Sequence, residues 1–325
     1  MAKKFKTIKT HLEEPWSGSG ASSITMQTVV EKPKSNVTEI VIYGLLIFLL
    51  MIGTYWRNGV WNSELDLWMD CVRKSPKKAR PHNNLGIFFF NQGEYQEATR
   101  EYNEALRIYP NYVEAHNNLG NLLLSQGRYD EAIPHLMEAL RIDPFFAGAH
   151  YNLGNVFSKQ GRYREATDQY NEALRINPNY AEARNNLGNV FLKQGKYQEA
   201  VPHFNEALRI NPNLAGAHYN LGNAFLNQSK YQEAIDQYHE ALRIKPNLAE
   251  ARNNLGNAFL NQGKYQEAID QYLEALRINP NYSEAHHNLG NAYLMIGNRG
   301  LALQEYEILK AINPVLASTL YQKIK

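Results

Sequence analysis

Asparagine side chains recur every 34 residues and are the sequence's clearest candidates for a hydrogen-bonding site. Two series lie three residues apart, so they share one face of a helix and form a polar ladder. A carboxamide donates and accepts hydrogen bonds, so the ladder could bind a peptide backbone whatever its sequence. The same side chains could instead satisfy neighbouring groups or face solvent. The series are Asn84, Asn118, Asn152, Asn186, Asn220, Asn254 and Asn288, then Asn121, Asn155, Asn189, Asn223, Asn257 and Asn291.

Other residue types that carry chemistry do not form a recognisable catalytic pattern. Most of the ten histidines follow the same repeat, which favours a packing role, and no His-x-x-x-His or mixed Cys/His spacing suggests a metal site. The adjacent carboxylates Glu13 and Glu14 lie in a polar tail, and a glycine-rich phosphate loop is absent from the sequence. We therefore expect no enzymatic activity, no cofactor and no metal.

The composition restricts the possibilities further. The chain has 325 residues, 44% of them hydrophobic, which is enough for a packed core. Its formal net charge of +2 gives no reason to expect nucleic acid as a partner. The single cysteine, Cys71, excludes an intrachain disulfide framework and a cysteine-rich zinc site.

The asparagines belong to a unit of 34 residues that predicts two amphipathic helices. Small residues such as Gly86 and Ala98 would let the two backbones approach, and Gly93 would supply the turn between them. Pro110 would end the second helix, and one unit cannot bury its apolar face alone, so neighbouring units must stack. The Leu-Gly pairs that mark the period begin at Leu85, Leu119, Leu153, Leu187, Leu221, Leu255 and Leu289.

This pattern of Leu-Gly, Tyr, Ala and Pro at a period of 34 resembles the tetratricopeptide repeat (TPR). The resemblance implies an all-α, right-handed solenoid with seven repeats over 79–316, in which the first helix of each unit lines a concave groove. Its second, fifth, sixth, ninth, twelfth and thirteenth positions would face that groove, which adds Tyr151 and Tyr219 to the asparagines as candidate partner-binding residues. The ladder is similar to that in the TPR arm of O-GlcNAc transferases. The basic residues of a carboxylate clamp are missing at the second, fifth and sixth positions.

The register also extends upstream and downstream of the seven repeats. Residues 57–78 are expected to form a linker and an unpaired second-type helix, with Ser63 as its N-cap, and 317–325 a C-terminal capping tail. Residues 1–39 form a polar tail with little expected structure. The junction around Thr54–Asn58 and Trp61 resembles that of TPR-containing O-mannosyltransferase-like membrane proteins.

Residues 40–56 carry no charge and predict a transmembrane helix. Lysines are concentrated before this segment, which predicts a single-pass membrane protein with a cytoplasmic N-terminus and an extracytoplasmic TPR domain, periplasmic in a bacterium. These patterns predict a membrane-anchored scaffold or adaptor that binds protein or peptide segments through its concave groove. A self-assembling structural protein and an accessory module of a membrane glycosyltransferase are the alternatives.

Overall fold

The computed structural model describes residues 37–60 and 63–325, and the described residues form seventeen α-helices. The chain divides into two units, Met1–Val60 and Trp61–Lys325. Most of the predicted polar tail, residues 1–36, lies outside the described residues, as does Trp61 of the predicted junction. The first unit contributes one described helix, α1, Val37–Val60.

The structure corrects the prediction of a transmembrane helix over 40–56. Within the part of the chain that is described, no helix combines the length and apolar character that crossing a bilayer requires. The predicted single-pass topology, with a cytoplasmic N-terminus and an extracytoplasmic TPR domain, is corrected with it, and so is the membrane partner assigned to 40–56.

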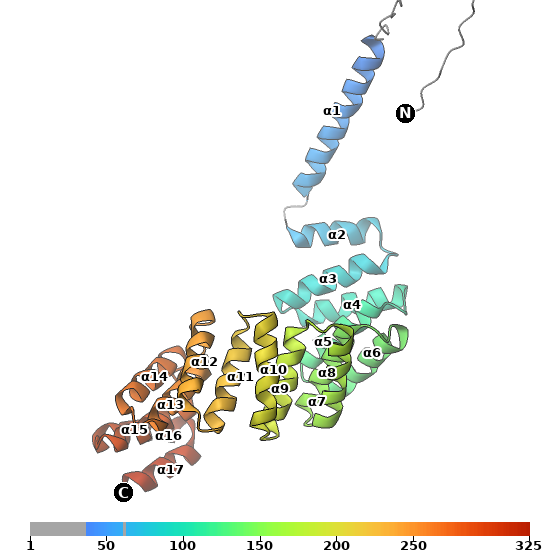
Figure 1. Cartoon of the computed structure of the whole chain (residues 1–325). Coiled ribbons are helices and arrows are strands. Elements are labelled where there is room, and N and C mark those ends of the chain that lie inside the picture. Colours follow the sequence, from blue (N-terminus) through green and yellow to red (C-terminus); the bar gives the residue numbers. More distant parts are fainter. Residues whose placement is uncertain (1–36, 61–62) are drawn as a thin grey trace, which may run out of the picture. The chain divides into compact units, whose positions relative to one another are not determined.

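The second unit is a stack of seven helix pairs with one further helix at each end, and the pairs follow one another along the stack (Figure 1). We call the pairs repeats 1–7 and their members helix A and helix B. Their bounds are α3 Ala79–Gln92 and α4 Tyr95–Ile108, α5 Val113–Ser125 and α6 Tyr129–Ile142, α7 Ala147–Lys159 and α8 Tyr163–Ile176, α9 Ala181–Lys193 and α10 Tyr197–Ile210, α11 Ala215–Asn227 and α12 Tyr231–Ile244, α13 Ala249–Asn261 and α14 Tyr265–Ile278, and α15 Ser283–Met295 and α16 Arg299–Ile312.

The turn between helix A and helix B needs a left-handed backbone. Gly93 adopts a φ of 79° there, which costs glycine little because it lacks a Cβ atom. In repeat 5 the same place is taken by Ser229, which has a φ of 59°. Among the described residues, no other non-glycine residue has a positive φ. This serine therefore stores backbone strain that the other turns avoid.

In the first six repeats an aromatic or aliphatic side chain of helix B packs on a glycine of helix A. A Cβ atom added at Gly256 would lie 2.5 Å from Cε1 of Tyr272, a ring that is completely buried. The alanines Ala268 and Ala275 on the same B helix are also completely buried. The helix A glycine thus leaves space that is filled by the ring of the facing helix.

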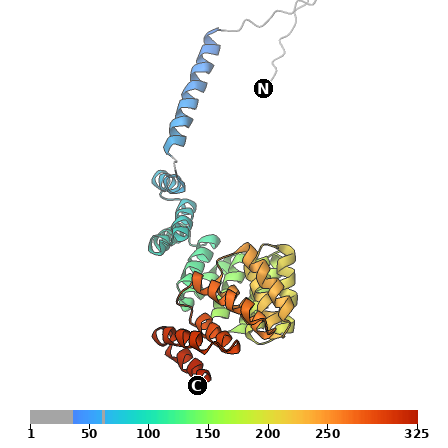
Figure 2. The same cartoon turned by 90° about the vertical axis from the view of Figure 1, so that its left-hand side faces the viewer.

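Helix A lies on the inner side of the stack. Successive A helices pack against one another, as α5 does with α7 and α9 with α11, whereas successive B helices make no comparable set of contacts in the described unit. A stack that brings its A helices together and spreads its B helices must curve toward the A side. Figure 2 shows the repeats of this unit winding in that way.

The two end helices cover the open faces of the stack. Helix α2, Glu64–Lys74, packs on α3, and its N-cap Ser63 accepts a hydrogen bond from the backbone N–H of Asp66, which confirms the predicted cap. Helix α17, Pro314–Ile324, packs on α15 and α16 and buries Leu320 completely. Leu320 contacts Gly290, the place that a helix B side chain takes in the other repeats.

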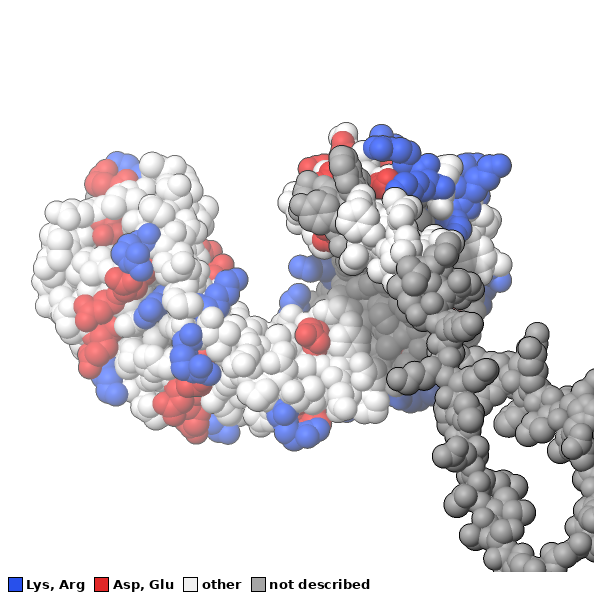
Figure 3. All heavy atoms as spheres, turned by 90° about the horizontal axis from the view of Figure 1, so that it is seen from above, with Lys and Arg blue, Asp and Glu red and all other residues white. Residues whose placement is uncertain are grey.

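The B helices carry a regular series of surface ion pairs. In the view of Figure 3, blue basic side chains lie beside red acidic ones over much of the repeat surface. In the first six repeats a glutamate pairs with the arginine three residues later, as Glu104 does with Arg107 at 2.6 Å. Exposed pairs of this kind contribute little to stability. The remaining pairs are Glu138–Arg141, Glu172–Arg175, Glu206–Arg209, Glu240–Arg243 and Glu274–Arg277.

Candidate protein-binding groove

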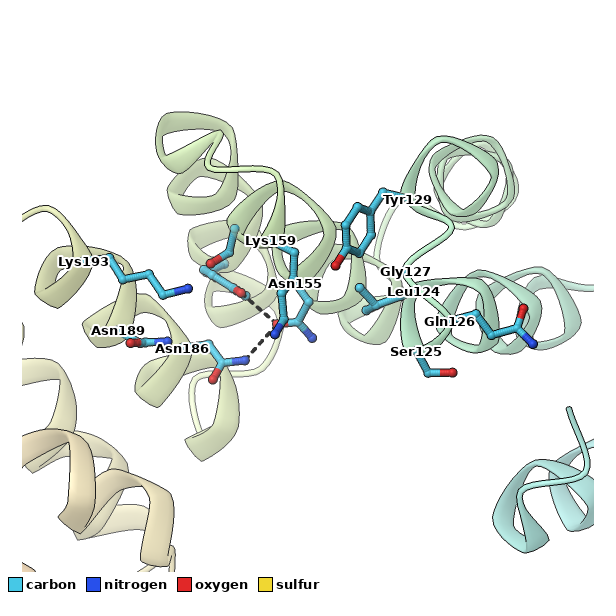
Figure 4. Close-up of a pocket in the computed structure, with 12 residues that line it drawn as sticks. Leu124, Ser125, Gln126, Gly127, Tyr129, Asn155, Lys159, Asn186, Asn189 and Lys193 are labelled. Carbon is cyan, nitrogen blue, oxygen red and sulfur yellow. Dashed lines mark hydrogen bonds between the residues drawn. The ribbon is translucent and has the colours of Figure 1, made fainter. Parts of the chain in front are cut away.

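A concavity of about 650 Å³ lies over the A helices of repeats 2–4 (Figure 4). Three asparagines of the predicted ladder line it together with two lysines and two tyrosines, and none of its lining residues is acidic. The asparagines come from α7 and α9, and Tyr129 begins α6. The lining is Leu124, Ser125, Gln126, Gly127, Tyr129, Asn155, Ser158, Lys159, Tyr170, Asn186, Asn189 and Lys193.

The asparagines at the sixth repeat position hold neighbouring repeats together. Nδ2 of Asn152 donates to Oδ1 of Asn117 in the preceding repeat at 2.9 Å, and Asn152 is only 8% exposed. The same bond recurs along the stack, so these amides satisfy one another across each interface. It is made by Asn118 to Asn83, Asn220 to Asn185 and Asn288 to Asn253, at 2.9 to 3.0 Å.

Two repeats vary this bond because they carry a tyrosine at the fifth position. Nδ2 of Asn186 reaches the hydroxyl of Tyr151 at 3.2 Å and Oδ1 of Asn155 at 2.8 Å. Asn254 makes the equivalent bonds, to Tyr219 at 3.3 Å and to Asn223 at 2.9 Å. The candidate residues Tyr151 and Tyr219 therefore accept bonds between repeats.

Three asparagines at the ninth position are oriented by hydrogen bonds from buried tyrosines of helix B. The hydroxyl of Tyr170 donates to Oδ1 of Asn155 at 2.7 Å, and burial raises the pKa of this tyrosine, so it stays protonated and remains a donor. Tyr238 and Tyr272 do the same for Asn223, at 2.8 Å, and Asn257, at 2.7 Å. In the last repeat Oδ1 of Asn291 accepts from Lys323 of α17 at 2.9 Å.

Asn121 and Asn189 are different because the hydroxyl is missing beneath them. Repeats 2 and 4 carry Leu136 and Phe204 in place of the buried tyrosine, and both side chains are completely buried. Within the described part of the chain, neither amide has a hydrogen-bond partner. Asn189 lines the concavity, so its whole amide is available to a ligand.

Two lysines make this part of the groove cationic. Lys159 and Lys193 end the A helices of repeats 3 and 4, and both are exposed. Figure 4 shows Lys193 extended toward Asn186 and Asn155, with Tyr129 on the other side of them. Nearby arginines have acidic partners, as Arg162 has Glu165 at 2.7 Å, but among the described residues neither lysine forms an ion pair.

The histidines at the fourth position connect helix A to helix B. Nδ1 of His286 lies 2.6 Å from Oε2 of Glu305, and Nε2 lies 3.0 Å from the carbonyl of Pro280 in the preceding turn. Desolvation opposes protonation of His286, but its two hydrogen bonds and the charge of Glu305 together raise its pKa. Across the described residues, no three His, Cys, Asp or Glu side chains come together as a metal site.

Comparison with known families agrees with this architecture. A family model described as TPR repeat matches residues 154–195, 188–229, 222–263 and 256–297, and two models described as tetratricopeptide repeat match 74–144 and 135–168. Together the matches run from residue 74 to residue 297, which is more than half of the chain. The chain belongs to the tetratricopeptide-repeat family. No curated protein matches it, and these matches do not support the finer resemblance to O-GlcNAc transferases or O-mannosyltransferase-like proteins.

Solved structures share the TPR fold. A chain of the APC/C hetero-tetramer Cut9–Hcn1 is 21% identical with a TM-score of 0.68, over 80% of this TPR protein and 52% of that chain, so only about half of its length is spanned. PilF of Pseudomonas aeruginosa is 24% identical with a TM-score of 0.60, over 66% and 97%. The pilus biogenesis factor PilW is 19% identical with a TM-score of 0.61, over 64% and 98%. At these identities the likeness concerns the fold alone.

Sequence reasoning did not separate the asparagines that line the concavity from those that bond to neighbouring repeats. Asn155, Asn186 and Asn189 line the concavity, whereas the other candidates lie along the remainder of the stack and mostly bond to neighbouring repeats. It also missed Lys159 and Lys193, which a count of charges on the groove face could have found. The exchange of tyrosine for Leu136 and Phe204 was visible in the sequence and signals the unpaired amides.

Proposed function

We propose that this TPR protein is a scaffold that binds a segment of another protein in its concave groove, with the main contact at repeats 2–4. The observation that carries the proposal is the concavity of about 650 Å³ together with the unpaired amide of Asn189 inside it. A concave polar lining with unused donors and acceptors is expected where a ligand supplies the missing partners.

The asparagine ladder takes part in two ways in this proposal. Asn155, Asn186 and Asn189 contact the bound segment directly. The remaining candidates, Asn84, Asn118, Asn121, Asn152, Asn220, Asn223, Asn254, Asn257, Asn288 and Asn291, with Tyr151 and Tyr219, extend the same polar face and allow a longer segment to continue along it. An amide-lined face suits an extended backbone, because each residue of the ligand offers one carbonyl and one N–H group.

The bonds between repeats also support this function. A groove that binds without reorganising loses less entropy on association. The links Asn152–Asn117 and Asn186–Asn155 hold the A helices of repeats 2–4 at a fixed spacing. The side chains that meet the ligand are therefore placed by contacts that exist before it arrives.

Affinity capture with matched variants tests the proposal. Asn189→Trp fills the concavity, whereas Asn205→Trp places the same bulk on exposed α10 in the same repeat. We expect proteins captured by the wild type to be retained by the Asn205 variant and lost by the Asn189 variant. Equal capture by both variants, at equal folding, would place the partner elsewhere and refute the proposal.

A further inference from the structure

The amide of Asn155 is oriented so that it presents only donors to the groove. Its Oδ1 accepts from the hydroxyl of Tyr170 at 2.7 Å and from Nδ2 of Asn186 at 2.8 Å. An amide oxygen has two lone pairs, so both are used by these bonds. Tyr170 is 1% exposed and belongs to the core, so the NH₂ group is the part that is left for a ligand.

The charged residues that line the concavity with Asn155 are of one sign. Lys159 and Lys193 line the same concavity, and its lining contains no aspartate or glutamate. Neither lysine has an ion-pair partner among the described residues. An ammonium group offers three donors and no acceptor, so the lysines add to the donors of Asn155. The lining thus favours a ligand that supplies acceptors and negative charge.

We infer that repeats 3 and 4 select an extended peptide segment that carries aspartate or glutamate side chains. In this arrangement the NH₂ group of Asn155 donates to a backbone carbonyl of the segment. Lys159 and Lys193 bind its carboxylates, and Tyr170 is a positioning residue that acts through Asn155. The inference rests on the proposed function, because it specifies the chemistry of the segment that occupies the groove.

Repeats 5 and 6 provide an internal comparison for this inference. There Tyr238 and Asn254 orient Asn223 with bonds of 2.8 and 2.9 Å, as Tyr170 and Asn186 orient Asn155. The places of the two lysines are taken by Asn227 and Asn261, which carry no charge. The same oriented donor is therefore present twice, and only the copy in repeats 3 and 4 adds a preference for acidic residues.

Two synthetic probes test the charge preference. A fluorescein-labelled peptide of alternating glutamate and glycine is compared, by fluorescence anisotropy with the full chain, with the matched glutamine–glycine peptide. The glutamate peptide should bind more tightly. Lys159→Gln with Lys193→Gln should weaken it about tenfold, since each exposed charge pair contributes a few-fold. Lys230→Gln with Lys245→Gln removes the same charge outside the concavity and should change binding less than twofold.

The outcomes separate this inference from the proposed function. Equal affinity for the two peptides, no binding of either, or equal loss in both double variants would overturn the acidic preference. The capture experiment with Asn189→Trp could still succeed in that case, and the scaffold function would stand. If both experiments fail, the groove is not the binding site.

A tyrosine variant tests the positioning role. Tyr170→Phe removes the hydroxyl and should weaken both peptides about threefold, because Asn155 is freed to turn its oxygen outward. In nuclear magnetic resonance spectra, the side-chain NH₂ signals of Asn155 should shift on adding peptide to the wild type and shift less in the variant. Tyr102→Phe is the control, since Ile87 stands where an asparagine would accept its bond. Unchanged affinity and unchanged signals in Tyr170→Phe would contradict the role.

Discussion

The hydroxyl of Tyr238 donates a hydrogen bond to Oδ1 of Asn223 at 2.8 Å, from a ring that is completely buried. This bond connects the core of a repeat to its groove. The core side chain that packs on Gly222 also sets the orientation of a groove side chain. The core composition of each repeat therefore decides which asparagines are fixed and which are free, and the predictions below follow from that.

Removing this hydroxyl should lower stability without disturbing packing. We expect Tyr238→Phe to reduce the free energy of unfolding by about 1 kcal/mol, the usual net value of such a bond. Tyr102→Phe, whose hydroxyl meets no asparagine, should differ from the wild type by a few tenths. Urea denaturation monitored by circular dichroism measures both. Identical losses in the two variants would show that the bond to Asn223 contributes nothing.

Replacing an asparagine that links two repeats should destabilise the protein more than replacing an asparagine without a hydrogen-bond partner. Asn152→Ala leaves Oδ1 of the half-buried Asn117 without its donor, so we expect a loss of about 1–2 kcal/mol. Asn189→Ala removes no hydrogen bond to a described residue and should leave the free energy of unfolding unchanged within about 0.5 kcal/mol. Thermal unfolding of the two variants side by side checks this. A larger loss for Asn189→Ala would mean that its amide is engaged in the fold.

A methyl group added to the repeat glycine should be damaging. Gly256→Ala places a Cβ 2.5 Å from the Tyr272 ring and should cost about 1–3 kcal/mol through overpacking. Gly216→Ala is the matched change on another A helix, where no atom lies within 4 Å. It should stabilise the chain by about 0.5–1 kcal/mol through helix propensity. Chemical denaturation should give opposite signs, and a common sign would refute the packing account.

The strained turn of repeat 5 predicts a stabilising change. Ser229→Gly relieves a serine with a φ of 59° and should raise the free energy of unfolding by up to about 1 kcal/mol. Local hydrogen exchange in α11 and α12 should slow accordingly. Faster exchange in the variant would indicate that the serine contributes contacts worth more than the strain.

The ion pair between His286 and Glu305 predicts a pH dependence. The folded pKa of His286 is raised, so the contribution to stability is fully present below the unfolded pKa of about 6.5 and is lost as pH rises through the folded pKa. The difference in unfolding free energy between the wild type and His286→Gln should therefore shrink from pH 5.5 to pH 8. Because both proteins contain the other histidines, their contribution to the pH dependence cancels in this difference. A difference that grows with pH would contradict the assigned direction.

Periodicity predicted the all-helical stack well, because a spacing of 34 residues with glycine, alanine and proline at set places restricts each unit to two packed helices. The N-cap Ser63 was predicted because the same register, extended upstream, places a helix directly after it. The transmembrane helix over 40–56 was wrong, because that prediction considered only charge and hydropathy along the sequence, and no described helix meets the requirements for a span.

The site was harder to predict because it depends on distances across repeats. Asn155 and Asn189 occupy the same position in successive repeats, yet Oδ1 of Asn155 accepts two hydrogen bonds, whereas the amide of Asn189 has no partner among the described residues. The difference comes from Phe204, fifteen residues further along the chain, which lacks the hydroxyl that Tyr170 supplies to Asn155. Only the packing of helix B on helix A brings these residues together.

The central claim is that the groove over repeats 2–4 binds another protein. Site-specific photocrosslinking is the most direct test of it. A photoreactive amino acid is placed at position 189 in the concavity or at position 205 on the outer face of the same repeat. The account predicts that irradiation joins a distinct polypeptide to the chain from position 189 and not from position 205. Crosslinks from position 205 alone, or none from position 189, would contradict it.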